Sequence, residues 1–559
     1  MRKTIVFTLS AFALFVLTAC SGKLGALSAD NFTVTPNPLE SKGGQVPVDI
    51  SSMFPEKYMK KKAVITVTPE LRSASARQQG QPYTFQGEKV LGNDQTISYR
   101  LGGRYTMKSN FGYQPEYQNS DLYLTFNARV GKKQVKIPEV KVANGVIATS
   151  ELYRLTMFSD GGILAPDSFQ HSRQLRQEAN IKFLINEANL RKSELQNNSV
   201  QEFVRLLKQI NADRERLNIK NVEVQAYASP EGGFSYNDRL ANRRQDVSEG
   251  YVKEQLKQTG LQQTDVNARY TAQDWEGFQQ LVQASNIQDK DVILRVLSMY
   301  KDPAEREQQI RNMSAGFQEL ATGILPELRR SRLIINYETI GRTDEEIERT
   351  FNSEPAKLSA DELLYLAAIK NTAAEKKAVY EKAAQLYDKD YRAFNNLATL
   401  ALAQGQEETA KNYIQQALRI NPNAAEPLAN LGLIQLKAGN TAEAEANIAK
   451  ATRTGNVAEA MGILSIAKGN YAQAVKEMAG INSNNAALAQ LLNKEYGNAA
   501  ITLEKIQQPN AMTDYLRALL AARRGNQYAA SANLKDALQK DPSLASYAEN
   551  DLELSLLKK

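Results

Sequence analysis

The C-terminal third of the chain repeats a pattern of bulky and small residues, and this repeat constrains the fold more than any other feature. From about Asp361 onward the sequence is rich in alanine, and the pattern recurs at roughly 34 residues. Small residues let paired helices approach closely, and each pair buries its open face on the next. The sequence therefore predicts an α-solenoid over residues 357–559, with about six helix pairs, two of them shortened.

The spacing resembles that of the tetratricopeptide repeat (TPR), in which the paired helices line a concave groove. By that resemblance the groove is lined by Tyr365, Asn395, Asn396, Thr399, Asn430, Leu433, Tyr515 and Leu519. This lining is mostly neutral or apolar, unlike TPR grooves that grip a C-terminal carboxylate with Lys, Arg and Asn. We expect the groove to bind an extended or helical segment of a partner protein, or to be filled by the chain's own C-terminal residues.

The N-terminus has the pattern of a secretory signal. A basic start precedes an apolar run from Ile5 to Leu17, which is too short for a comfortable membrane span. The run ends in Leu17-Thr18-Ala19-Cys20, which resembles the bacterial lipobox and implies cleavage before Cys20 and acylation of this only cysteine. We expect a signal peptide at 1–19 and a lipidated tether at 20–30. In one group of diderm bacteria, lipoproteins sent to the cell surface carry an acidic run just after the cysteine. The tether resembles none of these, since it has no acidic residue before Asp30. We therefore expect the periplasmic face of the outer membrane.

Residues 31–158 are expected to form a β-sandwich, because short apolar/polar alternations are separated by Pro and Gly turn signals. The alternating runs are 32–35, 46–50, 63–68, 122–130 and 134–142. Its tyrosines are expected to pack on strand faces, with a sugar-binding face as the alternative. A linker at 159–178 follows and holds the only histidine, His171, as a solvated residue. A single histidine removes most hydrolytic triads and nearly all histidine-based metal sites.

Between the linker and the repeats, the stretch Val222–Val252 combines an alternating strand, a polar loop and a helix expected at 234–258. Its residues Tyr236-Asn237, Leu240-Ala241, Arg243-Arg244 and Tyr251-Val252 follow the pattern of the OmpA-like domain, which the segment resembles. Ile181–Phe183, in a strand expected at 181–186, resembles the first strand of that family, and Arg330–Ile335 resembles its closing Arg-rich strand. The resemblance implies an α+β OmpA-like domain over 179–345, with a helical insertion at about 272–326.

The resemblance also implies a candidate peptidoglycan site made of Ser229, Glu231, Asn237 and Arg244. In peptidoglycan-binding members, an Asp and the Arg of the following helix clamp the zwitterionic end of diaminopimelate. Here Arg244 is retained, but Ser229 stands at the Asp position. A neutral hydroxyl is a weaker partner than a carboxylate for an ammonium group, and Glu231 is the alternative counter-charge. The alternative is that the fold is kept and the surface binds protein or nothing.

The composition excludes several functions. The formal net charge of +7 is small for a chain of 559 residues, and the sequence has no basic run with interleaved aromatic residues. We therefore expect no binding of nucleic acid. We find no phosphate loop, no metal-spaced cluster and no nucleophile with a base near it, so we expect neither an enzyme nor a cofactor. The sequence favours a multidomain, lipid-anchored scaffold that binds outer-membrane proteins or other lipoproteins through its repeats. A peptidoglycan tether and a surface adhesin or fibre-assembly accessory are the alternatives.

Overall fold

The computed structural model describes residues 24–159, 161–287, 289–312, 318–455 and 457–555. It divides into two compact units, one made of the chain up to Pro166 together with Ala367 onward, the other of Asp167–Leu366. The expected signal peptide, Cys20 and the first residues of the tether lie outside the described residues. Among the described residues, no helix combines the length and the apolar character needed to cross a membrane.

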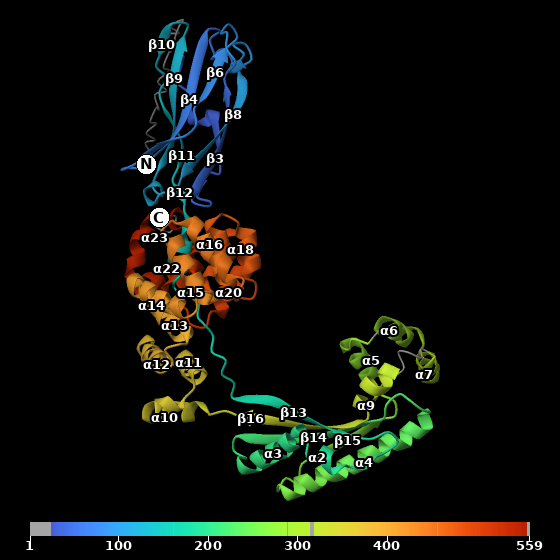
Figure 1. Cartoon of the computed structure of the whole chain (residues 1–559). Helices are drawn as coiled ribbons and strands as arrows, with labels where there is room; N and C mark the ends of the chain where they lie inside the picture. The colour runs from blue at the N-terminus through green and yellow to red at the C-terminus, as the bar shows by residue number, and fades with distance from the viewer. Residues whose placement is uncertain (1–23, 160, 288, 313–317, 456, 556–559) are drawn as a thin grey trace, which may run out of the picture. The chain divides into compact units, whose positions relative to one another are not determined.

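The first unit begins with two antiparallel-rich sheets that enclose one core (Figure 1). Side chains alternate strictly between buried and exposed along β3 (Gln45–Phe54), as a strand with one face on a core requires. One sheet has the order β1-β3-β8, with β1 (Phe32–Thr35) and β8 (Gly103–Gly112). The other has the order β10-β9-β4-β6-β7, with β11 also paired to β9 and β5 to β4. Its strands are β4 (Ala63–Arg72), β5 (Arg77–Gln79), β6 (Tyr83–Gly87), β7 (Gln95–Ile97), β9 (Asp121–Val130), β10 (Lys133–Val135) and β11 (Val140–Asn144).

The expected strand at 134–142 is wrong as one strand, because it divides into β10 and β11. Pro138 lies between them and has no N–H to donate to a ladder. Both still pair with β9, so the chain breaks and returns to the same neighbour. Tyr105 on β8 is buried in the shared core, which agrees with strand-face packing, whereas Tyr117 is buried there from a helical turn, Pro115–Tyr117.

The rest of the first unit is an array of TPR-like helix pairs. In the described residues it comprises α11 (Ala360–Ile369), whose first residues belong to the second unit, α12 (Ala373–Leu386), α13 (Tyr391–Ala403), α14 (Glu407–Ile420), α15 (Ala425–Lys437), α16 (Thr441–Ala451), α17 (Ala458–Ala467), α18 (Tyr471–Glu477), α19 (Asn484–Leu492), α20 (Tyr496–Lys505), α21 (Ala511–Arg523) and α22 (Gln527–Lys540). The approach within a pair is close, since a Cβ on Gly432 would lie 2.8 Å from Cγ1 of Ile448. The predicted solenoid is confirmed as a helical, TPR-like array.

The described part of the chain ends in two short helices, α23 (Ala545–Asn550) and α24 (Leu552–Ser555). They lie against the last repeat, where the Tyr515 hydroxyl donates to Oδ2 of Asp551 at 2.7 Å. They also reach the N-terminal part of this unit, since the Tyr547 hydroxyl donates to the Ala148 carbonyl at 3.2 Å. The C-terminal residues therefore cap the array.

The second unit is a mixed α/β fold built on one sheet with the order β13-β16-β14-β15 (Figure 1). Its strands are β13 (Ser172–Lys182), β14 (Leu217–Tyr227), β15 (Val266–Thr271) and β16 (Arg330–Ile340). Only β14 and β15 run parallel. The helices α3 (Asn198–Ala212) and α4 (Phe234–Gln258) bury their apolar faces on this sheet. The expected helix at 234–258 is confirmed, and the expected first strand at 181–186 is wrong because β13 ends at Lys182.

An additional helical subdomain lies between β15 and β16, as the sequence predicted. It contains α5 (Trp275–Ala284), α6 (Lys290–Met299), α7 (Pro303–Arg311), a π-helical turn at Leu320–Ile324 and α9 (Leu325–Leu328). These elements share a separate core that includes Phe278, Val282 and Ile293. Trp275, the only tryptophan, packs against that core.

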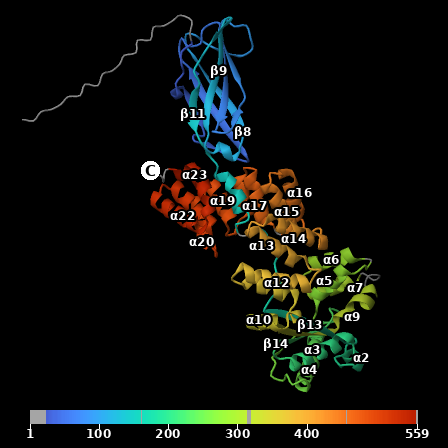
Figure 2. The ribbon, with the colours of Figure 1, turned by 90° about the vertical axis from the view of Figure 1, so that its left-hand side faces the viewer.

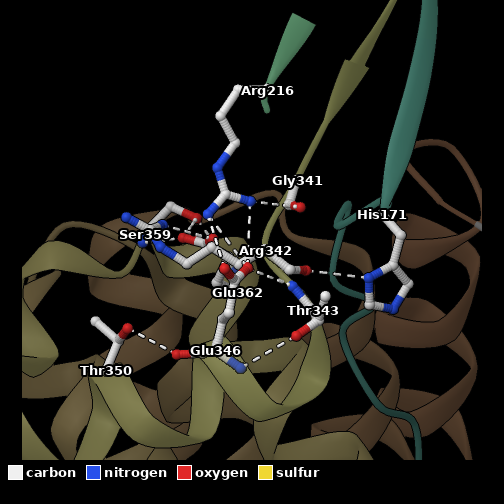
Figure 3. A network of polar contacts seen from close by, with 9 residues as sticks. All are labelled: His171, Arg216, Gly341, Arg342, Thr343, Glu346, Thr350, Ser359 and Glu362. Carbon is white, nitrogen blue, oxygen red and sulfur yellow. Dashed lines mark hydrogen bonds and ion pairs between the residues drawn. The ribbon is translucent and has the colours of Figure 1, made fainter. Parts of the chain in front are cut away.

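The end of β16 is fixed to α10 (Asp344–Ser353) and to the start of α11 by a polar network (Figure 3). Arg342 pairs with Glu362 at 2.7 Å, and Arg216 pairs with Glu346 at 3.1 Å. The ring of His171 accepts or donates at both nitrogens, to the Arg342 carbonyl at 3.1 Å and to the Tyr365 hydroxyl at 3.0 Å. The expected linker at 159–178 is therefore wrong in its second half, because His171 is a bonded residue and Ser172 begins a strand.

Candidate functional site

The concave side of the repeats is occupied by the segment that follows the β-sheets. After β12 (Val146–Ile147) the chain forms a helical turn, η3 (Thr149–Leu152) and α1 (Tyr153–Thr156), against α17 and α19 (Figure 2). Four side chains of this region join the core of the repeats, namely Leu152, Tyr153, Met157 and Phe158. The repeats therefore share their core with residues far upstream in the chain.

Beyond Phe158 the segment is held through its backbone by asparagine side chains. Asn430 accepts from the Ile163 N–H at 2.8 Å and donates to the Ile163 carbonyl at 2.9 Å. Asn396 makes the same pair with Ala165, at 2.8 and 2.9 Å. Asn395 adds a second donor to the Ile163 carbonyl at 3.0 Å. Each of these two amides thus pairs with the N–H and the carbonyl of one residue, as an opposite residue of an antiparallel strand does, and it does so at every second residue.

The preceding residues pass very close to the helices. Carbons added at Cβ of Gly161 and Gly162 would lie 2.8 Å from the Thr399 carbonyl oxygen and 2.7 Å from Oδ1 of Asn430. Both glycines also have a positive φ, +99° and +98°. Glycine is required here by space and by backbone conformation together.

The segment is anchored on its N-terminal side as well. The side-chain amide of Asn484 donates to Oγ of Ser159 at 3.1 Å, and that of Asn510 donates to the Ser159 carbonyl at 3.1 Å. Sequence reasoning missed Asn484 and Asn510, although the pair Asn484-Asn485 repeats the pair Asn395-Asn396. The repetition of paired asparagines in the first helix of different repeats is the signal that finds Asn484.

The structure separates the predicted groove residues into three groups. Asn395, Asn396 and Asn430 contact the segment, and Thr399 borders it through its carbonyl. Leu433, Tyr515 and Leu519 are fully buried among the helices. Tyr365 belongs to the second unit, where its hydroxyl donates to Oδ1 of Asp344 at 2.8 Å. The alternative that the C-terminal residues fill the groove is wrong, because Ser159 and residues 161–166 lie there and the C-terminal residues cap the last repeat. Binding of a partner segment stays a prediction.

The second candidate site surrounds Arg244 on α4. This guanidinium is fully buried and donates to three backbone carbonyls, those of Leu184, Glu187 and Tyr227, at 2.9 to 3.1 Å. It also lies over the Phe183 ring, 4.9 Å from the centroid. Burial, followed by repulsion from Arg329, lowers the pKa of Arg244 to about 10. Arg244 therefore ties the end of β14 to the chain that follows β13.

The polar groups of the loop before α4 also bond to neighbouring groups of the protein. The Asn237 side chain donates to the carbonyls of Ser229, Glu231 and Gly232, at 3.1, 2.9 and 3.2 Å. Glu231 is paired with Arg329 at 2.6 Å and accepts from the Ser229 hydroxyl at 3.0 Å. Its carboxylate is thus already engaged by a cation.

The helical subdomain holds the same loop from the other side. Glu307 on α7 accepts from the Gly232 N–H at 2.7 Å. A small, mostly apolar pocket lies there, lined by Pro230, Trp275, Phe278 and Ile310 among others. Glu307 and Arg329 are contacts of this loop that sequence reasoning missed, because both are more than 70 residues away along the chain. Of the four predicted residues, Ser229, Glu231 and Asn237 share one hydrogen-bonded network, whereas Arg244 bonds instead to the carbonyls of Leu184, Glu187 and Tyr227.

Comparisons with known proteins bear on the repeats. No family model matches the sequence, and no curated protein matches it. Among solved structures, a tetratricopeptide repeat protein from Parabacteroides merdae is 22% identical, with 39% of this chain and 91% of that chain covered and a TM-score of 0.28. PilF of Pseudomonas aeruginosa is 18% identical, with 34% of this chain and 95% of that chain covered and a TM-score of 0.25. PilW, a type IV pilus biogenesis factor, is 21% identical, with 36% of this chain and 98% of that chain covered and a TM-score of 0.25. Likeness of this degree carries no information about what the chain binds.

Proposed function

We propose that this chain is a non-enzymatic scaffold that binds partner proteins through its TPR-like repeats. The observation that carries the proposal is the asparagine pairing, in which Asn396 and Asn430 each hold both polar backbone groups of one residue. Such a surface recognises an extended backbone whatever most of its side chains are, as in recognition by added strands. This chemistry suits the binding of protein segments.

We further propose that the scaffold belongs to the cell envelope, as an outer-membrane lipoprotein facing the periplasm. The lipobox-like run Leu17–Cys20 supports the lipid anchor, and outer-membrane proteins or other lipoproteins are the partners that this location offers. The second unit is proposed to be OmpA-like, which the helix Phe234–Gln258 and the Arg-rich closing strand β16 support. Peptidoglycan tethering is the weaker candidate, because Arg244 and Glu231 would first have to leave their present partners.

Site-specific photo-crosslinking in the native envelope tests the scaffold proposal. A photoreactive amino acid at Gln507, an exposed residue beside the groove, is expected to crosslink a defined set of envelope proteins. The matched control is the same substitution at Leu91, a fully exposed residue of the β-sheet region. An identical set of products from both positions, or none from Gln507, would contradict partner binding through the repeats.

A further inference from the structure

The segment in the groove is held in two different ways along its length. Its first half is anchored by burial, since Leu152 and Met157 are at most 2% exposed inside the core of the repeats. Its second half, Gly161–Pro166, buries less side-chain surface: two residues are glycines, Leu164 is 53% exposed, and Ile163 packs only partly on the core. The hydrogen bonds from Asn395, Asn396 and Asn430 hold this half, and all of them go to backbone atoms.

We propose that Gly161–Pro166 is an exchangeable internal ligand, and that an extended segment of a partner protein takes its place in the groove. The inference rests on the proposed function and specifies its site, its regulation and the chemistry of the partner segment. The first half of the segment stays anchored during the exchange, so the repeats keep their core.

The exchange is balanced in hydrogen bonds. Each bond that Ile163 and Ala165 give up is remade with a peptide group of the incoming segment, and a typical hydrogen bond contributes little net free energy. The internal segment is favoured because it is covalently linked to the repeats, which gives it an effective concentration on the order of millimolar. A partner that binds must therefore contribute contacts beyond those with Asn395, Asn396 and Asn430.

The space around the segment defines the sequence of the partner. Two consecutive glycines are required where Gly161 and Gly162 lie, because a Cβ at either position would collide with the helices. An aliphatic residue fits at Ile163, which packs partly on the core of the repeats. The next position is free because Leu164 faces solvent, and a small residue is needed at Ala165, which is 3% exposed. The partner segment therefore reads Gly-Gly-aliphatic-any-Ala.

An open concavity next to Ser159 offers such a partner further contacts. It has a volume of about 860 Å³ and is lined by Ser159, Glu459, Ser483 and Asn510 among others. The side-chain oxygens of Asn484 and Asn485 are buried beside these lining residues, without a hydrogen-bond partner among the described residues. The contacts that an incoming backbone can reach are those of the polar side chains that line the concavity, such as Glu459 and Ser483.

The test uses the full chain and a labelled synthetic peptide with the sequence of residues 159–166. In the variant Gly162→Val, the added side chain is expected to expel the internal segment and leave the asparagine amides open. We expect the peptide to bind this variant at least tenfold more tightly than the unaltered chain, measured by fluorescence anisotropy. The matched control is Leu164→Val, which changes an exposed side chain of the same segment and is expected to behave like the unaltered chain.

Equal affinity for the unaltered chain and for Gly162→Val would overturn the internal ligand while leaving a peptide-binding groove, and with it the proposed function, intact. No binding to either folded protein would overturn both the internal ligand and the groove as a receptor. If Gly162→Val does not fold, hydrogen exchange of the unaltered chain decides. Excess peptide is expected to leave the N–H groups of Ile163 and Ala165 exchanging faster, and unchanged exchange at millimolar peptide would overturn the proposal.

Discussion

Replacing Arg244 by methionine should destabilise the second unit. Methionine fills most of the same volume but leaves the carbonyls of Leu184, Glu187 and Tyr227 without their donor. A hydrogen bond that involves a charged group contributes about 1.5–3 kcal/mol, so the loss of three such bonds costs roughly 6 kcal/mol. Against this, burial lowers the pKa of Arg244 well below that of a free arginine, to about 10, which means that keeping the cation buried already costs about 3 kcal/mol. The net loss is about 3 kcal/mol.

The only tryptophan, Trp275, lies in the second unit, so its fluorescence follows the unfolding of that unit in urea or on heating. For a unit of this size, a loss of about 3 kcal/mol lowers the melting temperature by roughly 6–12 °C. The matched control is Arg243→Met, which removes an exposed arginine from the same helix turn and should change the melting temperature little. If Arg244→Met and Arg243→Met have the same melting temperature, the three carbonyls are satisfied without Arg244 and the reasoning fails.

Two further predictions concern the repeats. Gly432→Ala should destabilise the array by about 1–3 kcal/mol, because its Cβ would lie 2.8 Å from Ile448; in circular dichroism melts, Gly497→Ala, which meets no atom within 4 Å, is the neutral control. Burial raises the pKa of Asp551 from 3.8 to about 6, so the folded state binds the proton more tightly. The free energy of unfolding of the unaltered chain, compared with that of Asp551→Asn, should therefore rise by up to about 3 kcal/mol as the pH falls from about 6 to about 4. A difference between the two proteins that does not change with pH would contradict this.

Sequence patterns predicted the elements that bury a periodic face. The helix Phe234–Gln258 and the strand β3 are of this kind, and both carry a regular row of buried side chains. The first residues of β13 carry no such row, since Ser172–Arg176 are all exposed. They are a strand because they pair along β16, a partner more than 150 residues away. Pairing of this kind leaves no periodic pattern in the strand itself, so the sequence alone indicates a linker there.

Arg244 shows a second limit of sequence reasoning. The resemblance places an arginine at the right position of the helix, but it does not say which acceptors face it. Here the carbonyls of Leu184 and Glu187 approach the guanidinium, and Glu231 is engaged by Arg329. In this chain Arg244 thus joins two segments of the fold.

The groove shows the same limit from the side of the ligand. Asn396 and Asn430 occur one repeat apart, so their common row could be predicted from the register of the helices. The ligand of this row could not be predicted, because side-chain amides that bond to backbone groups require only that the ligand's side chains fit the available space. The only trace in the sequence is Gly161-Gly162, which is typical of flexible linkers as well. In this chain Gly161-Gly162 and the paired asparagines lie more than 200 residues apart, so only the folded structure shows that one is the ligand of the other.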